Sequence, residues 1–160
     1  MRLAAATDYG LRVLMRLARE PEGVLTTLRI AQESHIPYNH LAKVVQDLAR
    51  GGFVTTQRGA GGGLRLARPA EAIRLGEVVR FLEQRHALVE CFRADGGSCE
   101  LNPHCRLKVR LAAAREAFLR DLDDSTVADC ADPGPPVAGM QPGPREPQSR
   151  RRGASYRGAQ

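Results

Sequence analysis

Apolar residues recur at three- and four-residue spacing in three segments of the first fifty residues, the pattern of amphipathic helices. The predicted helices run over residues 4–19, from Thr26 or Thr27 to Ser34, and over residues 39–50. A tight turn at residues 35–37 precedes the third helix, and this order predicts a helix-turn-helix. The predicted inward-facing residues are Leu3, Gly10, Val13, Leu14, Leu17, Leu28, Ile30, Ala31, Leu41, Val44, Val45 and Leu48.

The pattern changes from helical to alternating after Gly51-Gly52. Residues 53–57 and 63–67 each alternate like a strand, and a glycine-rich segment with one cation, Arg58-Gly59-Ala60-Gly61-Gly62, lies between them. Glycines let a backbone approach a phosphate or a minor groove closely, and Arg58 is expected to enter that groove. Taken alone, the glycines equally fit a plain flexible hairpin. After a helix-turn-helix, the hairpin predicts the wing of a DNA-binding domain.

Two further amphipathic segments follow the wing. The first, over residues 73–83, presents Leu75, Val78, Val79 and Leu82 on one face. The second, over residues 105–122, presents Leu107, Leu111, Ala114, Phe118 and Leu122. The longer apolar face requires a partner, either the core of this chain or the same helix of a second subunit. We predict a mainly α fold with a small β-hairpin wing, namely a winged helix-turn-helix plus a long dimerisation helix.

The net charge of +6 is unevenly distributed. Residues 1–90 carry 13 Lys and Arg against 9 Asp and Glu, residues 91–132 carry 6 against 8, and residues 133–160 carry 5 against 1. A basic front half suits a phosphate backbone as partner, although an ordinary basic surface has the same composition. The enzyme class is disfavoured, because no phosphate-binding loop, dinucleotide fingerprint or supported nucleophile set occurs.

Composition also suggests three parts of the chain. We expect a DNA-binding domain over residues 1–72, a cysteine loop with a dimerisation helix over residues 73–132, and a disordered basic tail over residues 133–160. The tail is rich in Pro, Gly and Arg and has almost nothing to bury. No apolar run approaches the roughly 20 residues of a membrane span, and the start does not look like a secretory signal. A cytoplasmic location is expected.

Side chains at the start of the third helix are candidates for reading double-stranded DNA. Asn pairs with adenine edges, and Lys reaches guanine or phosphate. Each of these side chains can equally be a solvated surface residue, and Asn39 can be a helix cap. RNA is a weaker fit, because few aromatic residues are available to stack on unpaired bases. The predicted DNA-binding residues are Tyr38, Asn39, His40, Lys43, Arg58, Gly59, Gly61 and Gly62.

Three cysteines stand between the two apolar segments of the second half. Seven residues separate Cys91 from Cys99 and five separate Cys99 from Cys105, in a stretch rich in Gly and polar residues. In a reducing compartment such a cluster favours metal binding over structural disulfides. A zinc site usually includes a short C-x₂₋₄-C pair, which neither gap provides, and a thiol switch is the second alternative. Cys130 lies a whole helix away and is predicted to be a bystander.

Four separated blocks of this chain resemble one family of regulators. They are residues 7–12 (Thr-Asp-Tyr-Gly-Leu-Arg), residues 39–45, the wing residues 58–63, and the three cysteines with Leu107-Lys108 after them. Over about residues 1–130 the sequence is similar to the NsrR-like repressors, the nitric-oxide-sensitive group of the Rrf-type winged-helix family. IscR-like iron–sulfur regulators belong to the same family.

The resemblance implies a homodimer that binds a palindromic operator and holds an iron–sulfur cluster on Cys91, Cys99 and Cys105. Nitrosylation of the cluster is expected to release the operators of nitric oxide detoxification genes. A 4Fe–4S cluster is preferred and 2Fe–2S is possible.

The fourth ligand is less sharply defined. The resemblance places Asp8 of the partner subunit there, although Asp8 also suits the start of a helix. His86 and His104 are further candidates, whereas the IscR-type histidine is replaced by Leu107-Lys108. A family regulator that senses iron or cluster status, or redox stress, is the alternative function.

Overall fold

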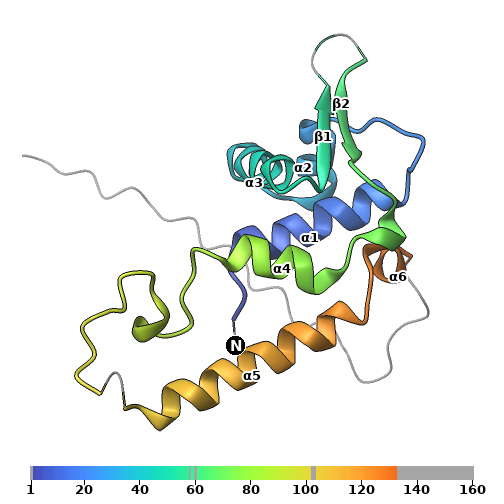
Figure 1. Cartoon of the computed structure of the whole chain (residues 1–160). Helices are drawn as coiled ribbons and strands as arrows, with labels where there is room; N and C mark the ends of the chain where they lie inside the picture. Colours follow the sequence, from blue (N-terminus) through green and yellow to red (C-terminus); the bar gives the residue numbers. More distant parts are fainter. Residues whose placement is uncertain (1, 58, 60, 102–103, 133–160) are drawn as a thin grey trace, which may run out of the picture.

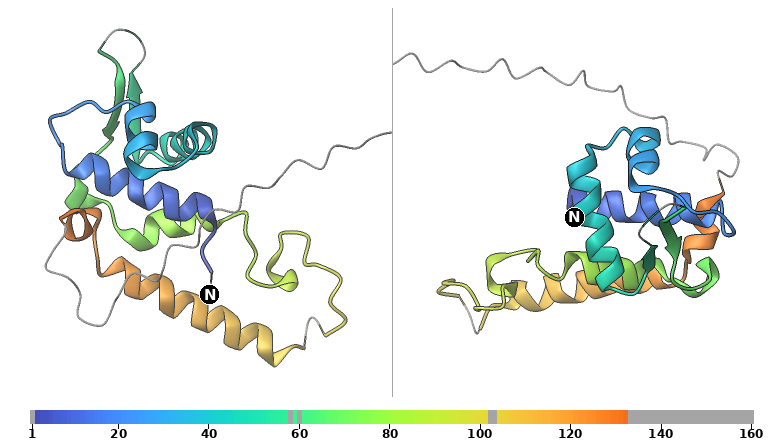
Figure 2. Two further views of the ribbon diagram at one scale, coloured as in Figure 1. Left: turned by 180° about the vertical axis from the view of Figure 1, so that it is seen from behind. Right: turned by 90° about the horizontal axis from the view of Figure 1, so that it is seen from above.

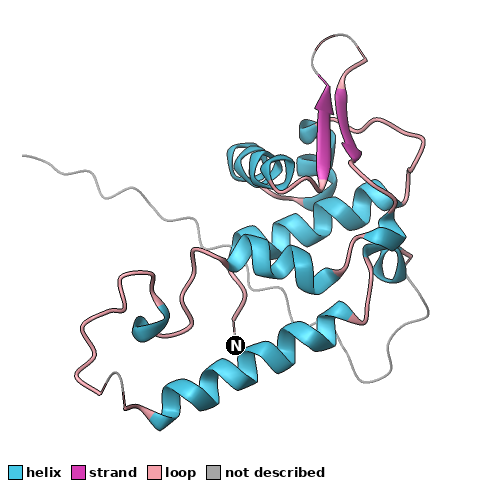
Figure 3. Cartoon of the chain, in the orientation of Figure 1, coloured by secondary structure: helices cyan, strands magenta, loops and turns pink. Residues whose placement is uncertain are grey.

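A computed structural model describes residues 2–57, 59, 61–101 and 104–132. It confirms a mainly helical winged helix-turn-helix with one antiparallel hairpin (Figures 1 and 3). Short 3₁₀ turns lie at Ala70–Ala72 and Glu90–Phe92. The helices and strands are α1 (Ala5–Ala18), α2 (Thr27–Ser34), α3 (Tyr38–Arg50), β1 (Val54–Gln57), β2 (Gly63–Leu66), α4 (Leu75–Glu83), α5 (Arg106–Asp123) and α6 (Val127–Ala131).

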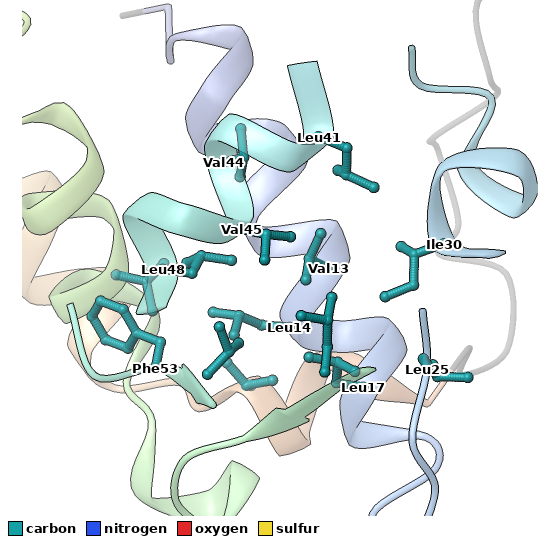
Figure 4. Close-up of a cluster of buried hydrophobic side chains, with 14 of the residues drawn as sticks. Val13, Leu14, Leu17, Leu25, Ile30, Leu41, Val44, Val45, Leu48 and Phe53 are labelled. Carbon is teal, nitrogen blue, oxygen red and sulfur yellow. The ribbon is translucent and has the colours of Figure 1, made fainter. Parts of the chain in front are cut away.

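Helix α1 lies at the centre of the fold and contacts α3, α4 and α6 (Figures 1 and 2). Its predicted inward face is confirmed, with Val13, Leu14 and Leu17 buried against α3 and the wing (Figure 4). Gly10 allows the closest approach, because a Cβ added there would lie 2.6 Å from Leu82 Cδ1 of α4. Ile73, Val78 and Leu82 join the same core, so the packing of the chain continues across residue 72, where the sequence analysis placed a boundary.

Local signals define the helix-turn-helix. The Thr26 side chain accepts the Arg29 backbone N–H at 3.1 Å and caps α2, as predicted. His35 adopts the left-handed conformation, with φ 55°, and turns the chain toward α3. The prediction that Leu28 faces inward is wrong, because it is exposed while Ile30 is buried. Residues two apart on a helix point to opposite sides, so Leu28 and Ile30 cannot both face the core.

The wing consists of β1 and β2, paired from Val54 with Leu66 to Gln57 with Gly63. A backbone bridge between Leu25 and Leu64 ties the hairpin to the segment before α2. A Cβ at Gly63 would lie 2.7 Å from the Leu25 carbonyl oxygen, so this approach requires glycine. The hairpin projects from the fold beside α3 and away from α5 (Figure 1).

Helix α6 was not predicted. Thr126 and Asp129 form a capping box, in which the Thr126 N–H donates to Asp129 Oδ2 at 2.7 Å and the Asp129 N–H donates to Thr126 Oγ1 at 3.3 Å. The helix packs against α1, where Arg19 Nε donates to the Ala131 carbonyl at 2.5 Å. The segment after α5 therefore returns to the central core.

Helix α5 has a packed end and an unpacked end. Near its C-terminus, Leu119 is buried and Asp123 accepts two hydrogen bonds from Arg80 of α4, at 2.8 and 2.5 Å. Near its N-terminus, Leu107 and Val109 are 63% and 68% exposed. The predicted apolar face therefore does not belong to this chain's core at Leu107.

We call residues 84–118 the arm and the other described residues the body. None of the described residues of the arm is buried, whereas every buried hydrophobic residue lies in the body. The arm extends from the body as a loop followed by most of α5 (Figures 1 and 2). In the described part of the chain, no helix combines the length and apolarity needed to cross a membrane.

Candidate functional site

The outer face of α3 carries the four polar or aromatic candidates for DNA contact. Tyr38, Asn39, His40 and Lys43 are all exposed, whereas the opposite face is buried in the body. Pro37, and not Asn39, occupies the N-cap position of α3, so the alternative of Asn39 as a cap is wrong. A row of exposed polar side chains at a helix start suits the major groove.

The wing tip contributes backbone rather than side chains in its described part. Gly59 and Gly61 have φ angles of 99° and 79°, which side-chain-bearing residues rarely adopt. The Gly62 N–H donates to the Gly59 carbonyl at 2.9 Å and closes the turn. The predicted groove cation, Arg58, lies outside the described residues. The tip presents exposed backbone at Gly59 and Gly61, as close contact with a phosphate backbone requires.

The cysteine loop occupies the arm. Cys91 lies in the 3₁₀ turn Glu90–Phe92, Cys99 lies in the loop, and Cys105 immediately precedes α5. All three are half-buried free thiols. Within the described ranges, no three His, Cys, Asp or Glu side chains gather closely enough to hold a metal ion. The structure therefore places the three cysteines along one loop without drawing them together as ligands.

Hydrogen bonds next to two of the cysteines close part of this loop. Glu90 Oε1 accepts the Ser98 N–H at 3.1 Å and the Ser98 hydroxyl at 2.9 Å. The Ser98 N–H and hydroxyl stabilise the carboxylate and hold the pKa of Glu90 below its usual value. Because Glu90 precedes Cys91 and Ser98 precedes Cys99, the two cysteine-bearing segments are linked.

The three arm cysteines have the chemistry that an iron–sulfur cluster requires of its ligands. Cysteine thiolates are the usual ligands of such clusters. Two of these cysteines lie on segments that Glu90 and Ser98 join, and Cys105 lies at the N-terminal end of α5, where negative charge is favourable. Cys130 lies in α6, on the other side of α5 in the chain. Cys91, Cys99 and Cys105 are therefore the residues that would hold a cluster.

The candidates for a fourth ligand are spread over the chain. Asp8 forms an ion pair with Arg12 of the same helix at 2.9 Å, and both side chains are about half exposed. A second subunit can therefore reach the Asp8 carboxylate. His104 is exposed beside Cys105, and His86 is exposed at the start of the arm, with Nδ1 3.9 Å from Glu83 Oε2.

Glu83 is a site residue that the sequence analysis missed. At the end of α4, its Oε1 accepts the Ala4 N–H at 2.8 Å and the Thr7 hydroxyl at 2.5 Å. Thr7 is completely buried, and the Glu83 side chain is only 13% exposed. Its partners lie more than seventy residues earlier in the chain, so no local pattern reveals this contact.

A comparison with protein families matches almost the whole described chain to one family. Residues 3–133 match the Rrf2 family, described as an iron-dependent transcriptional regulator. No helix or strand of the described chain falls outside that match.

Solved structures agree with the family match. CymR, the global cysteine regulator of B. subtilis, is 30% identical with a TM-score of 0.62, over 82% of this chain and 96% of that one. The oxidised form of Staphylococcus aureus CymR is 30% identical with a TM-score of 0.64, over 82% and 97%. IscR of T. potens is 25% identical with a TM-score of 0.64, over 81% and 85%. With its winged helix-turn-helix and this match, the chain belongs to the Rrf2 family of DNA-binding transcriptional regulators.

Proposed function

We propose that this protein is a homodimeric, cytoplasmic repressor that holds an iron–sulfur cluster on Cys91, Cys99 and Cys105 and releases its operator when nitric oxide reacts with the cluster. One observation carries the proposal. Three free thiols lie on an arm whose described residues are all at least partly exposed, and both ends of that arm join a packed DNA-binding body. A ligand that orders the arm can therefore act on the body.

The body supplies DNA binding in this proposal. Base edges in the major groove would be read by Tyr38, Asn39, His40 and Lys43. The glycine tip of the wing would lie along the phosphate backbone of the DNA. Arg58 is assigned the minor groove from sequence alone. A two-fold dimer places two such reading surfaces on a palindromic operator about one helical turn apart.

The exposed apolar side chains of α5 support the dimer. Leu107 is exposed in one chain, and Leu111, on the same face one turn later, is half-buried. An isologous interface between two copies of α5 would cover them. In such a dimer, Asp8 of one subunit would serve the cluster of the other, as the resemblance to NsrR-like repressors implies.

The chemistry of the donors supports the sensor. Three thiolates anchor a cluster, preferably 4Fe–4S, and an oxygen donor such as Asp8 is a poorer match for its iron, leaving one exchangeable corner. A bound cluster supplies iron that reacts with nitric oxide. The protein's own residues hold the thiolates on the loop closed by Glu90 and Ser98, and connect that loop to α4 and α5.

A thiol-based regulator is the second candidate. The similarity to CymR, named a global cysteine regulator and also solved in an oxidised form, favours it. The four cysteines described here are all free and half-buried. In this alternative a disulfide among the arm cysteines, and not a cluster, would change DNA binding.

An anaerobic absorbance spectrum with stepwise nitric oxide addition, paired with a DNA mobility shift, tests the proposal. We expect a broad cluster band that bleaches as DNA is released, and loss of that band in Cys91→Ser, Cys99→Ser and Cys105→Ser. Cys130→Ser is the matched control and should behave like the wild type. A colourless protein whose DNA binding ignores nitric oxide but responds to a thiol oxidant would reject the cluster and establish the second candidate.

A further inference from the structure

We propose that Glu83 is the positioning residue that couples the cysteine-bearing arm to the recognition helix α3. This inference rests on the proposed function, namely that the state of the arm governs DNA binding. Glu83 is the last residue of α4, and the arm starts at residue 84. A rearrangement at the start of the arm therefore acts on the residue next to it, Glu83.

The contact that Glu83 makes joins α4 to the start of α1. Helix α1 begins without a side-chain cap of its own, and the Glu83 carboxylate accepts the free N–H of its N-cap residue, Ala4. The buried Thr7 hydroxyl donates to the same oxygen at 2.5 Å. A carboxylate near a helix N-terminus also interacts favourably with the helix dipole. A group adjacent to the arm therefore holds the first turn of α1.

The start of α1 is in turn in contact with α3. At Gly10, one turn beyond Thr7, an added Cβ would meet Leu82 of α4 at 2.6 Å, Val44 of α3 at 3.6 Å and Leu48 of α3 at 3.7 Å. Leu82 is the neighbour of Glu83. One short, closely packed segment thus connects α4, α1 and α3, and a displacement of the last turn of α4 changes the support of the recognition helix.

Both ends of the arm are attached to α4, which strengthens the case. The first end continues from Glu83. Beyond the second end, in the last turn of α5, Asp123 accepts two hydrogen bonds from Arg80 of α4, at 2.8 and 2.5 Å. A ligand that draws the cysteines together pulls on the two attachments at once. Glu83 differs from Asp123 in that its carboxylate contacts α1 directly.

The experiment compares operator affinity before and after chelator removal of the cluster, in the wild type and in four variants. Glu83→Ala removes the acceptor, Thr7→Val removes one donor with little change of shape, and Glu83→Gln retains a carbonyl acceptor. Glu77→Gln is the matched control, because Glu77 is also a carboxylate of α4 but pairs with Arg68, at 2.5 Å, and not with the start of α1. Amide exchange of Ala4 to Asp8 in cluster-free protein gives a readout independent of the cluster.

We expect the ratio of operator affinity with the cluster to operator affinity without it to fall at least about fivefold in Glu83→Ala, which is within the range of allosteric coupling energies. The fall should be smaller in Thr7→Val. Glu83→Gln and Glu77→Gln should keep the wild-type ratio, and amide exchange at the start of α1 should accelerate only in the first two variants. Should Glu83→Ala fail to fold, Thr7→Val decides the question.

Two negative outcomes are distinguishable. A wild-type ratio near one rejects the proposed function, and this inference with it. A large wild-type ratio that is unchanged in Glu83→Ala and Thr7→Val overturns only the role of Glu83.

Discussion

The body and the arm of this protein are stabilised in different ways. The body buries a continuous apolar core around α1, so its shape follows from the hydrophobic effect within one chain. The arm has no buried residue among those described. It is shaped by local polar contacts, such as Glu90 with Ser98 and Arg93 with Asp95 at 2.7 Å. Exposed contacts of this kind contribute little stability.

This difference suggests how a regulator separates reading from sensing. A surface that reads DNA must keep its geometry, and the buried core of the body supports such a surface. A sensing segment must change with its ligand, which requires a small free-energy difference between its conformations. Because no described residue around the cysteines is buried, the proposed ligand and second subunit would set that difference.

The strongest test of the comparison is one truncation in each region. Leu14→Ala in the body leaves a cavity in the core and should lower the free energy of unfolding by about 2–5 kcal/mol. Leu101→Ala in the arm, where the side chain is 69% exposed, should change it by less than about 0.5 kcal/mol. Urea unfolding followed by circular dichroism measures both. Equal losses would show that the arm is packed as firmly as the body.

The junction between the regions is tested by Gly76→Ala. A Cβ at Gly76 of α4 would lie 2.5 Å from the Leu119 carbonyl oxygen of α5. Because backbone cannot rotate away, the two helices must separate, and we expect a loss of about 1–3 kcal/mol in thermal unfolding. Gly10→Ala serves as comparison, since its nearest contact is the end of the Leu82 side chain. A smaller loss at Gly76 than at Gly10 would contradict the close α4–α5 approach.

A smaller loss of stability is expected at the start of α6, the helix that packs against α1. Thr126→Ala removes the hydroxyl that accepts the Asp129 N–H and should cost about 1 kcal/mol in chemical unfolding. Ser125→Ala is the control, because Ser125 contributes its backbone carbonyl to Leu75 and keeps it in the variant. Similar losses in both variants would argue against the capping box.

The smallest effect concerns pH. Arg80 hydrogen-bonds Asp123 and holds the pKa of Asp123 below its usual value. A lowered pKa in the folded state adds stability above the ordinary aspartate pKa and loses it as the pH falls toward the folded value. Since the pair is partly exposed, Asp123→Asn should cost less than about 1 kcal/mol at pH 7, and the difference should shrink steadily as the pH falls below the ordinary aspartate pKa of about 3.9. A difference that grows with acid would refute this sign.

Local sequence signals were sufficient for most of the body. The helical spacing of Leu41, Val44, Val45 and Leu48 predicted the buried face of α3, and the alternation around the glycines predicted the wing. Helix α6 was missed although Thr126 and Asp129 carry a capping signal, because the helix has only five residues. Short helices take their stability from tertiary contacts, which a local pattern does not contain.

The candidate site was less accessible to sequence reasoning. Cysteine spacing identified the loop, and the resemblance supplied Asp8, whose ligand role stays a prediction. Glu83 left no signal because both of its partners are distant in the chain. Leu107 was placed on the correct type of helix face, yet one chain leaves it exposed. Periodicity shows that a face is apolar and does not show which molecule covers it.

Helix α5 is attached to the body near its C-terminus, and this makes it a mechanical lever. Its 18 residues correspond to a length of about 27 Å at the α-helical rise. A tilt of about 5° around the Asp123 attachment would displace Cys105, at the far end, by roughly 2 Å. In the opposite direction, a force applied at the thiol acts on the α4–α5 contact with the full leverage of the helix. In the proposed function, a bond made or broken at Cys105 would therefore exert a torque on the body.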